Sequence, residues 1–267
     1  GHPLHAFDYD EIGGGEVVVR RALQGERFVT LDGVERELSA EDLMICDTKK
    51  PMCLAGVFGG EKSGVTGKTT KVFLESAYFN PVSIRKSSKR HMLKTDASFR
   101  FERGANPEVL PYALKRAATM LSELAGARVV GGIEEFYPEK IERAQVSLNF
   151  ERMEDLIGKR IGAKSILTIL ELMEYDIFSS NSEGAVVSVP GYRVDVTREC
   201  DVVEDVLRIY GYNNVELPER MSASLTPGVK PDPERIRELT ANLLVNNGFY
   251  EMMNNSLTKG DYYLKLK

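Results

Sequence analysis

Short runs of β-branched and apolar residues, separated by turn signals, occupy the first part of this chain and leave little room for helices there. Residues 16–20 and 42–46 are two such runs, and residues 72–76 are a third. Between the first two, Asp32-Gly33 suits the positive φ values of a tight hairpin turn. The pattern predicts a β-rich region over roughly the first 100 residues.

A helical pattern follows the predicted strands. Asn106 is a suitable N-cap, Pro107 stands in the first turn, and apolar residues recur at helical spacing up to Gly126. We expect this helix to pack against the sheet. The chain then becomes charged and contains Pro138, which favours a domain boundary there. We therefore predict a first domain over residues 1–140.

The remaining residues predict two further units. Residues 146–220 alternate short helices and strands, with an amphipathic helix at 164–174 and a strand at 185–189, as in a small α+β domain. Residues 221–267 begin with closely spaced prolines before another helical pattern, and we interpret them as the truncated start of a third domain. The predicted fold class is α+β.

Composition excludes several classes of protein. No apolar run approaches the ~20 residues that a transmembrane helix needs. The 35 basic and 40 acidic residues give a net charge of −5, so any contact with nucleic acid must be local or shared with a partner. Three cysteines without a Cys-x-x-Cys pair fit a reducing cytoplasm. The start at Gly1, without an initiator Met or a signal sequence, predicts a piece of a longer protein.

Familiar catalytic motifs are missing from the sequence. Residues 64–69 look like a phosphate-binding loop, but Lys62 stands where the motif requires its first glycine. The three histidines lack the spacing of a zinc site, and there is no Gly-x-Ser-x-Gly elbow for a nucleophilic serine. If the protein is a hydrolase, we expect water to be the attacking group.

Several segments are informative when they are read together. They are GHPLHAFD (1–8), LAGVFGG (54–60), LESAYF (74–79), TDASFRFERG (95–104), RVDV (193–196) and DVVEDVLRIYGY (201–212). In this order they closely resemble the editing region of the bacterial phenylalanyl-tRNA synthetase β subunit family. The resemblance covers nearly the whole chain, and it implies a β-rich editing domain with packed helices followed by a small winged-helix-like α+β domain.

The resemblance implies hydrolysis of tyrosine wrongly attached to tRNA(Phe), within an enzyme that ligates phenylalanine to tRNA(Phe) using ATP. Such editing is needed because a hydrophobic pocket rejects the additional hydroxyl of tyrosine only ~10²-fold. A second pocket can reverse the selection, since a buried acceptor that phenylalanine leaves unpaired costs roughly 1–3 kcal/mol. The resemblance assigns this acceptor to Glu75. Taken alone, the segment favours a strand-end carboxylate in a surface ion pair, and only the resemblance reverses this.

The remaining site residues also come from the resemblance. It places His5 beside the aminoacyl ester, where a histidine can orient water or the terminal ribose. Thr95 and Ala97 match residues near the reacting ester, while Gly56 and Gly59 match glycines that let the substrate approach the backbone. The predicted catalytic residues are thus His5, Glu75 and Thr95, and the predicted substrate-binding residues are Gly56, Gly59 and Ala97. Structural roles for the histidine and the glycines remain open at this point.

An acidic cluster forms a second candidate site. Asp201, Glu204 and Asp205 share one face of a predicted helix, and Asp195 precedes it. Oxygen ligands of this kind suit Mg²⁺, although Glu204 could instead pair with Arg208 at i+4. The resemblance implies that these four carboxylates bind Mg²⁺ in a site shared with the α subunit of an α₂β₂ enzyme. Editing itself is expected to need neither Mg²⁺ nor ATP.

The sequence also leaves open a role for its basic run and two alternative functions. The basic run 85–91 could meet phosphates near the acceptor end of tRNA(Phe), or it could be a solvated helix face. Residues 146–218 have the size of a winged-helix unit, so a non-catalytic nucleic-acid-binding module is one alternative function. A metal-dependent hydrolase centred on the acidic helix is the other. The expected location is the cytoplasm, without a membrane partner.

Overall fold

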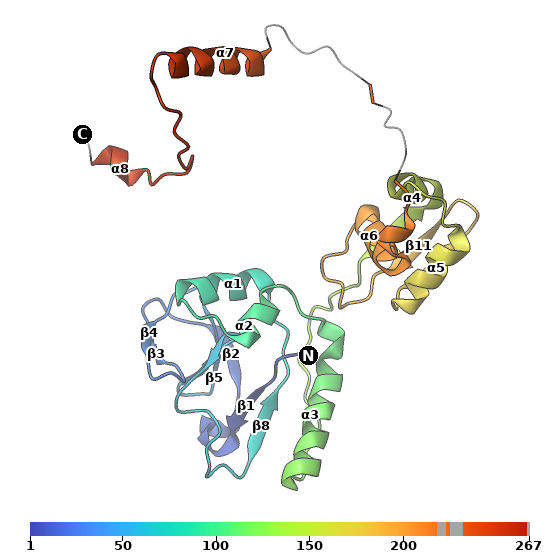
Figure 1. Cartoon of the computed structure of the whole chain (residues 1–267). Helices are drawn as coiled ribbons and strands as arrows, with labels where there is room; N and C mark the ends of the chain where they lie inside the picture. The colour runs from blue at the N-terminus through green and yellow to red at the C-terminus, as the bar shows by residue number, and fades with distance from the viewer. Residues whose placement is uncertain (218–222, 225–231, 266–267) are drawn as a thin grey trace. The chain divides into compact units, whose positions relative to one another are not determined.

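The computed structural model describes residues 1–217, 223–224 and 232–265 (Figure 1). Gly1–Glu216 form one compact unit and Leu217–Lys267 form another. The first unit contains two hydrophobic cores, one built from residues between Phe7 and Phe101 and one from residues between Val146 and Val206. The mixture of helices with antiparallel sheets confirms the predicted α+β class.

Eight short strands surround the first core, which confirms the predicted β-rich character of this region, although the sequence pattern predicts only three of them. They are β1 (His5–Asp8), β2 (Val18–Arg21), β3 (Arg27–Val29), β4 (Glu35–Glu37), β5 (Leu43–Cys46), β6 (Pro51–Leu54), β7 (Phe58–Gly59) and β8 (Val72–Glu75). β2, β5, β6 and β7 form a four-stranded sheet, while β1 pairs with β8 and β3 with β4, all antiparallel. The predicted turn at Gly33 has a φ of 74° and lies between β3 and β4.

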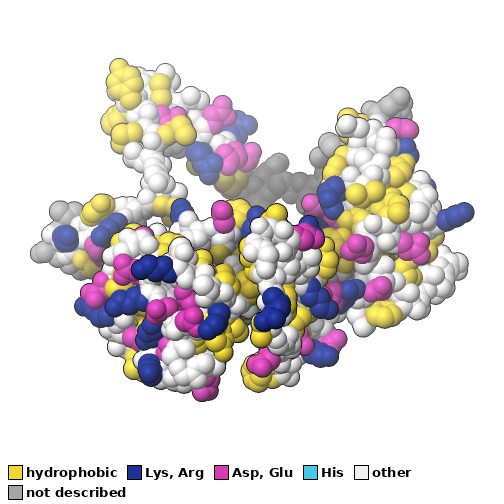
Figure 2. Space-filling model, turned by 90° about the horizontal axis from the view of Figure 1, so that it is seen from below, with side chains coloured by type: hydrophobic (Ala, Val, Ile, Leu, Met, Phe, Trp, Pro, Cys, Tyr) yellow, Lys and Arg dark blue, Asp and Glu magenta, His cyan; other side chains and the backbone are white. Residues whose placement is uncertain are grey.

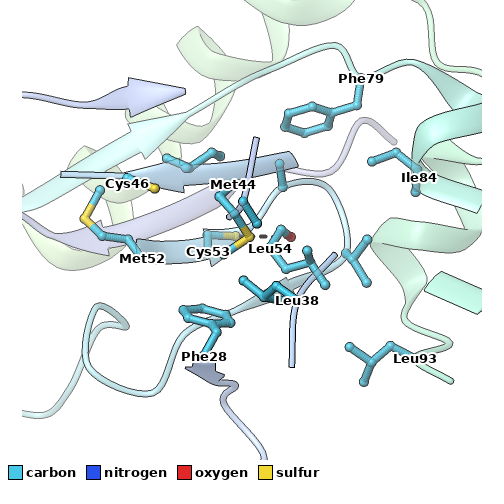
Figure 3. Packing of buried hydrophobic residues seen from close by; sticks show 14 of the residues in the cluster. Phe28, Leu38, Met44, Cys46, Met52, Cys53, Leu54, Phe79, Ile84 and Leu93 are labelled. Carbon is cyan, nitrogen blue, oxygen red and sulfur yellow. Dashed lines mark hydrogen bonds between the residues drawn. The ribbon is translucent and has the colours of Figure 1, made fainter. Parts of the chain in front are cut away.

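Helices complete this part of the chain. They are α1 (Pro81–Arg90), α2 (Asp96–Phe101), α3 (Leu110–Ala125) and the short 3₁₀ helices η1 (Tyr9–Glu11), η2 (Gly13–Gly15) and η3 (Pro107–Val109). Asn80 caps α1 by accepting hydrogen bonds from the backbone N–H groups of Val82 and Ser83. Ile84 of α1 and Phe79 lie in the same buried cluster as Met44 and Leu54 of the sheet (Figure 3).

The helix predicted after Asn106 is present, but its packing differs from the expectation. Asn106 caps η3, and Gly126 ends α3 in the left-handed conformation, with a φ of 63°. No residue of α3 is buried. Its start is tied to the sheet by the Ser76 hydroxyl, which donates to the backbone oxygen of Leu110 at 3.0 Å. The apolar stripe of α3 therefore contributes little to the first core.

A second core follows the extended segment between α3 and Gln145. Its elements are β9 (Gln145–Asn149), α4 (Phe150–Ile157), α5 (Ala163–Leu172), β10 (Asp176–Ser180), β11 (Gly184–Ser188), α6 (Glu199–Tyr210) and η4 (Tyr212–Asn214). The three strands form an antiparallel sheet in the order β10-β11-β9. Met153, Ile166 and Val202 bring the three helices onto this sheet, and all three side chains are fully buried. This is the small α+β unit that the sequence predicts.

The second unit contains α7 (Pro233–Asn246) and α8 (Asp261–Leu264), neither of which has a buried residue. Asp232 caps α7 by accepting a hydrogen bond from the Glu234 N–H at 3.0 Å. The predicted boundary at residues 220–221 lies outside the described residues, so the division into domains 1–140, 146–220 and 221–267 stays a prediction. Among the described helices, none combines the length and the apolar character that crossing a membrane requires.

Basic and acidic side chains are intermixed over the face shown in Figure 2, with apolar side chains between them. This mixture agrees with the small net charge of −5.

Candidate active site

His5 and Glu75 face each other across the pair β1–β8, where they are directly opposite in the antiparallel register. Side chains at such positions lie on the same face of the sheet, a few ångströms apart. His5 Nε2 and Glu75 Oε2 are both buried, and neither has a hydrogen-bond partner among the residues that the structure describes. Because an unpaired buried polar atom costs roughly 1–3 kcal/mol, two of them side by side mark a place where a ligand can supply partners.

Burial also changes the protonation of this pair. It raises the pKa of Glu75 to about 7. Burial lowers the pKa of His5, so its imidazole is neutral at neutral pH. Near pH 7, Glu75 can therefore accept a hydrogen bond as a carboxylate or donate one as an acid. The neutral His5 ring can accept a proton from water or hold the water in place.

Gly59 lies against the His5 ring. A Cβ atom on Gly59 would stand 2.8 Å from His5 Cε1 and 2.9 Å from Leu31 Cδ1, so only glycine lets β7 approach the imidazole this closely. The family resemblance predicts that the substrate approaches the backbone at Gly59, whereas in the structure the His5 ring occupies this space. Cys53, which sequence reasoning missed, pairs with Gly59 in the β6–β7 hairpin, and its pKa is raised by burial and by the charge of Glu75.

Gly56 has a different environment. It lies in the turn between β6 and β7 with a φ of 66°, which favours glycine. A side chain there would stand 2.7 Å from the ring of Phe79 and 2.8 Å from Ile84 Cδ1. Its contacts are therefore with the first core, so the structure explains this glycine by turn geometry and packing.

Thr95 caps α2. Its hydroxyl accepts a hydrogen bond from the Ser98 N–H at 3.0 Å and donates one to the backbone oxygen of Val57 at 2.7 Å. The Thr95 side chain thus ties α2 to the turn that leads into β7. Ala97, in the first turn of α2, packs against the first core. The structure brings His5, Glu75 and Gly59 together, and it joins Thr95 to them through the β6–β7 hairpin.

Comparison with known proteins places this site in a family. Residues 1–126 match the B3/4 domain, and residues 146–212 match the tRNA synthetase B5 domain. The phenylalanine–tRNA ligase beta subunit of Bacteroides fragilis strain YCH46 is 51% identical over 264 residues, which cover 98% of this chain and 32% of that protein. That of Porphyromonas gingivalis strain W83 is 48% identical over 269 residues, which cover 100% of this chain and 33% of that protein.

The chain belongs to the phenylalanine–tRNA ligase beta subunit family. It spans about a third of the length of the curated relatives that it matches. Among solved structures it is similar to an N-terminal fragment of the phenylalanyl-tRNA synthetase beta subunit from Pyrococcus horikoshii. The identity is 21% and the TM-score 0.41, with 78% of this chain and 60% of that chain covered.

In this chain, the carboxylates on and near the acidic helix α6 do not gather into one cluster. Asp205 is completely buried and is surrounded by donors. Arg193 donates to both carboxylate oxygens of Asp205, at 2.7 and 3.0 Å, and the Tyr175 hydroxyl donates at 2.7 Å. The helical spacing suggests Arg208 as a partner of Glu204, but the Arg208 guanidinium contacts Asp205 instead, at 3.3 Å. These four contacts leave no free face of the Asp205 carboxylate for a cation.

The other three predicted ligands differ in environment. Asp201 accepts hydrogen bonds from the backbone N–H groups of Thr197 and Arg198, and the Arg198 guanidinium lies 2.9 Å from it. Asp195 and Glu204 are exposed. Over the described residues, no group of three or more His, Cys, Asp or Glu side chains has a geometry that could hold a metal ion. The four carboxylates as arranged here do not fit Mg²⁺, and the metal site stays a prediction without structural support.

Proposed function

We propose that His5 and Glu75 line a pocket, and that this pocket hydrolyses tyrosine from tRNA(Phe) that has been charged with the wrong amino acid. The observation that carries this proposal is the pair of buried, unpartnered atoms, His5 Nε2 and Glu75 Oε2, on opposite positions of β1 and β8. An aminoacyl ester with a phenolic hydroxyl offers what this pair lacks. The hydroxyl can meet Glu75, while water near the ester can meet His5.

Discrimination follows from the state of Glu75. With tyrosine bound, the phenol is a partner for the buried Oε2, whether Glu75 accepts or donates the hydrogen bond. With phenylalanine bound, the same atom stays buried and unpaired. The difference of roughly 1–3 kcal/mol corresponds to about a 5- to 150-fold preference for the tyrosyl ester. A charged carboxylate widens the preference further.

In the proposed hydrolysis, a water oxygen attacks the ester carbonyl carbon, and the bond from that carbon to the ribose oxygen breaks. The products are free tyrosine and a tRNA with its terminal hydroxyl restored. His5 orients the water, and its neutral ring can take up a proton from the water as the new bond forms. That proton goes to the departing ribose oxygen. The reaction requires neither a metal ion nor ATP.

The whole enzyme extends beyond this chain. The relatives are named beta subunits of phenylalanine–tRNA ligase, which supports an α-subunit partner. The α₂β₂ assembly and its location in the cytoplasm are part of the proposal and rest on the family resemblance alone. In this proposal the ATP-dependent ligation of phenylalanine takes place in the assembled enzyme, and residues 1–140 form the editing domain that acts afterwards. The acceptor end of tRNA(Phe) carries the ester to this domain.

The test uses the full-length enzyme with its α subunit. Tyrosyl-tRNA(Phe) and phenylalanyl-tRNA(Phe) are incubated separately with the unchanged enzyme and with the Glu75→Ala variant, and release of amino acid is followed. The unchanged enzyme should clear tyrosine preferentially, and Glu75→Ala should lose most of that preference while it still charges phenylalanine. Selective clearance by Glu75→Ala would remove Glu75 from its assigned role. Sensitivity of hydrolysis to a chelator would favour a metal-dependent hydrolase instead.

A further inference from the structure

One set of exposed basic and apolar side chains extends along the chain from the end of α1 to just beyond α2. It consists of Lys89, Met92, Lys94, Phe99, Arg100 and Arg103, and it is called the 89–103 strip below. Building on the proposed function, we propose that this strip binds the single-stranded acceptor end of the tRNA whose ester enters the His5–Glu75 pocket. Between residues 85 and 103 there are seven basic and two acidic residues, in a chain whose net charge is −5.

Not every basic residue of this region is available to a phosphate. Arg90 contacts the buried carboxylate of Asp42 at 2.5 Å and Glu41 at 3.0 Å. Lys86 lies 3.8 Å from Glu41. His91 is buried and contacts Asp42 at 2.7 Å. The basic run that the sequence suggests for RNA therefore serves partly to hold α1 on the strand region around Asp42.

Four charges remain: Arg85, which donates only to the backbone oxygen of Glu102, and three that lie in the 89–103 strip. Lys89, Lys94 and Arg100 are exposed, and no carboxylate within the described parts of the chain pairs with them. Lysine and arginine side chains without internal partners are the groups that neutralise phosphates and displace condensed counterions. Their charge complements a nucleic-acid backbone.

Two apolar side chains in the strip suit unstacked bases. The Arg103 guanidinium lies over the ring of Phe99, with its carbon 3.6 Å from the ring centroid, and Phe99 is 57% exposed. Met92 is 89% exposed and has a φ of 55° just after α1 ends. An aromatic ring with a stacked guanidinium offers a surface on which bases of a single strand can stack.

The strip is also connected to the pocket. α2 starts at Asp96, directly after Thr95, whose hydroxyl holds the backbone oxygen of Val57 at 2.7 Å. Gly59, which lies against the His5 ring, is two residues beyond Val57 in the sequence. RNA that is held along α2 would thus be held beside the turn that carries one wall of the pocket. This arrangement fits a strand that lies on the 89–103 strip and inserts its terminal ester.

The experiment compares two triple charge reversals in the full-length enzyme. The first is Lys89→Glu, Lys94→Glu and Arg100→Glu. The control is Lys68→Glu, Arg128→Glu and Lys140→Glu, which makes the same charge change at exposed positions elsewhere in residues 1–140. Binding of tRNA(Phe) is measured over a range of salt concentrations, and deacylation of tyrosyl-tRNA(Phe) is measured at several concentrations of that tRNA.

The first variant should bind tRNA(Phe) at least about tenfold more weakly, and the slope of log K against log salt should fall by about 2, as three single-strand phosphate contacts require. KM for deacylation should rise, whereas hydrolysis of a small tyrosyl ester should be unchanged. Separately, Phe99→Ala should weaken binding by about tenfold with the salt slope intact. If the reversal and its control behave alike, the strip is not the RNA site. If the unchanged enzyme does not clear tyrosine selectively, the proposed function fails instead.

Discussion

Glu75 lies opposite His5 in the antiparallel pair β1–β8, and each residue keeps one buried polar atom that no described part of the chain hydrogen-bonds. Buried polar groups in folded proteins are nearly always paired, so two neighbouring exceptions require an explanation. A core position would have been filled more favourably by an apolar side chain. The pair therefore marks a place where the fold is less stable than it could be, as recognition sites commonly are.

The first prediction concerns stability and pH. Burial raises the pKa of Glu75 from 4.5 to about 7, so the folded state binds a proton more tightly than the unfolded state. The contribution of Glu75 to the free energy of unfolding is greatest below pH 4.5 and is lost as the pH rises through about 7. Glu75→Gln, which cannot ionise, should therefore be more stable than the unchanged protein at pH 8, by an amount on the order of 3 kcal/mol. The two proteins should converge near pH 4.

The measurement is urea unfolding of both proteins across this pH range. His5 contributes a slope of opposite sign, because burial lowers its pKa and its contribution is lost as the pH falls below its usual value of 6.5. That slope is common to both proteins, so the difference between them isolates Glu75. A constant difference from pH 4 to pH 8 would show that Glu75 ionises normally in the fold.

A second prediction concerns the wall of the pocket. Gly59→Ala places a methyl group 2.8 Å from His5 Cε1, so the imidazole or β7 must move. We expect a stability loss of about 1–3 kcal/mol and a marked fall in tyrosyl-tRNA(Phe) deacylation. Gly67→Ala is the matched control, since nothing lies within 4 Å of its added methyl group. If Gly59→Ala deacylated tyrosyl-tRNA(Phe) as fast as the unchanged enzyme, the position of His5 would not matter for the reaction.

Local patterns were sufficient to predict much of this fold. Residues 42–46 and 72–76 contain β5 and β8, and Gly126 ends α3 where the sequence predicts, although Asn106 caps η3 and not α3. The pairing of β1 with β8 could not be read from the sequence, because it joins segments about 70 residues apart, and no local pattern encodes such a register. The neighbourhood of His5 and Glu75 was predicted through family resemblance alone.

The side chains around the predicted sites were the least predictable feature. Asp205 looked like one of three carboxylates on an exposed helix face, but its partner Arg193 comes from a loop outside that helix. The partner of Thr95 is likewise distant in sequence, at Val57. Helical spacing shows which residues share a face, but it cannot show what another segment brings to that face.

The role of Thr95 leads to a third prediction. Because its hydroxyl is fully engaged with Val57 and Ser98, Thr95 should act by positioning the β6–β7 turn. Thr95→Ser keeps both hydrogen bonds and should retain deacylation. Thr95→Val keeps the shape but loses the helix cap, and it should cost about 1 kcal/mol of stability and raise KM for tyrosyl-tRNA(Phe) more than it lowers kcat. Equal loss of activity in both variants would contradict a role that depends on the hydroxyl.

The final prediction concerns Asp205 and the metal. Replacing Asp205 by Asn leaves the mostly buried guanidinium of Arg193 with only the exposed Asp195 carboxylate, at 3.8 Å, as a counter-charge, which should destabilise the second core by about 3 kcal/mol. Glu204→Gln, at an exposed position of the same helix, should change stability by less than about 0.5 kcal/mol.

Thermal unfolding is measured with excess Mg²⁺ and with a chelator. Since arginine and tyrosine already occupy the Asp205 carboxylate, neither addition should shift the transition of the unchanged protein. A stabilisation by Mg²⁺ that Asp205→Asn abolishes would instead restore the four carboxylates as a metal site.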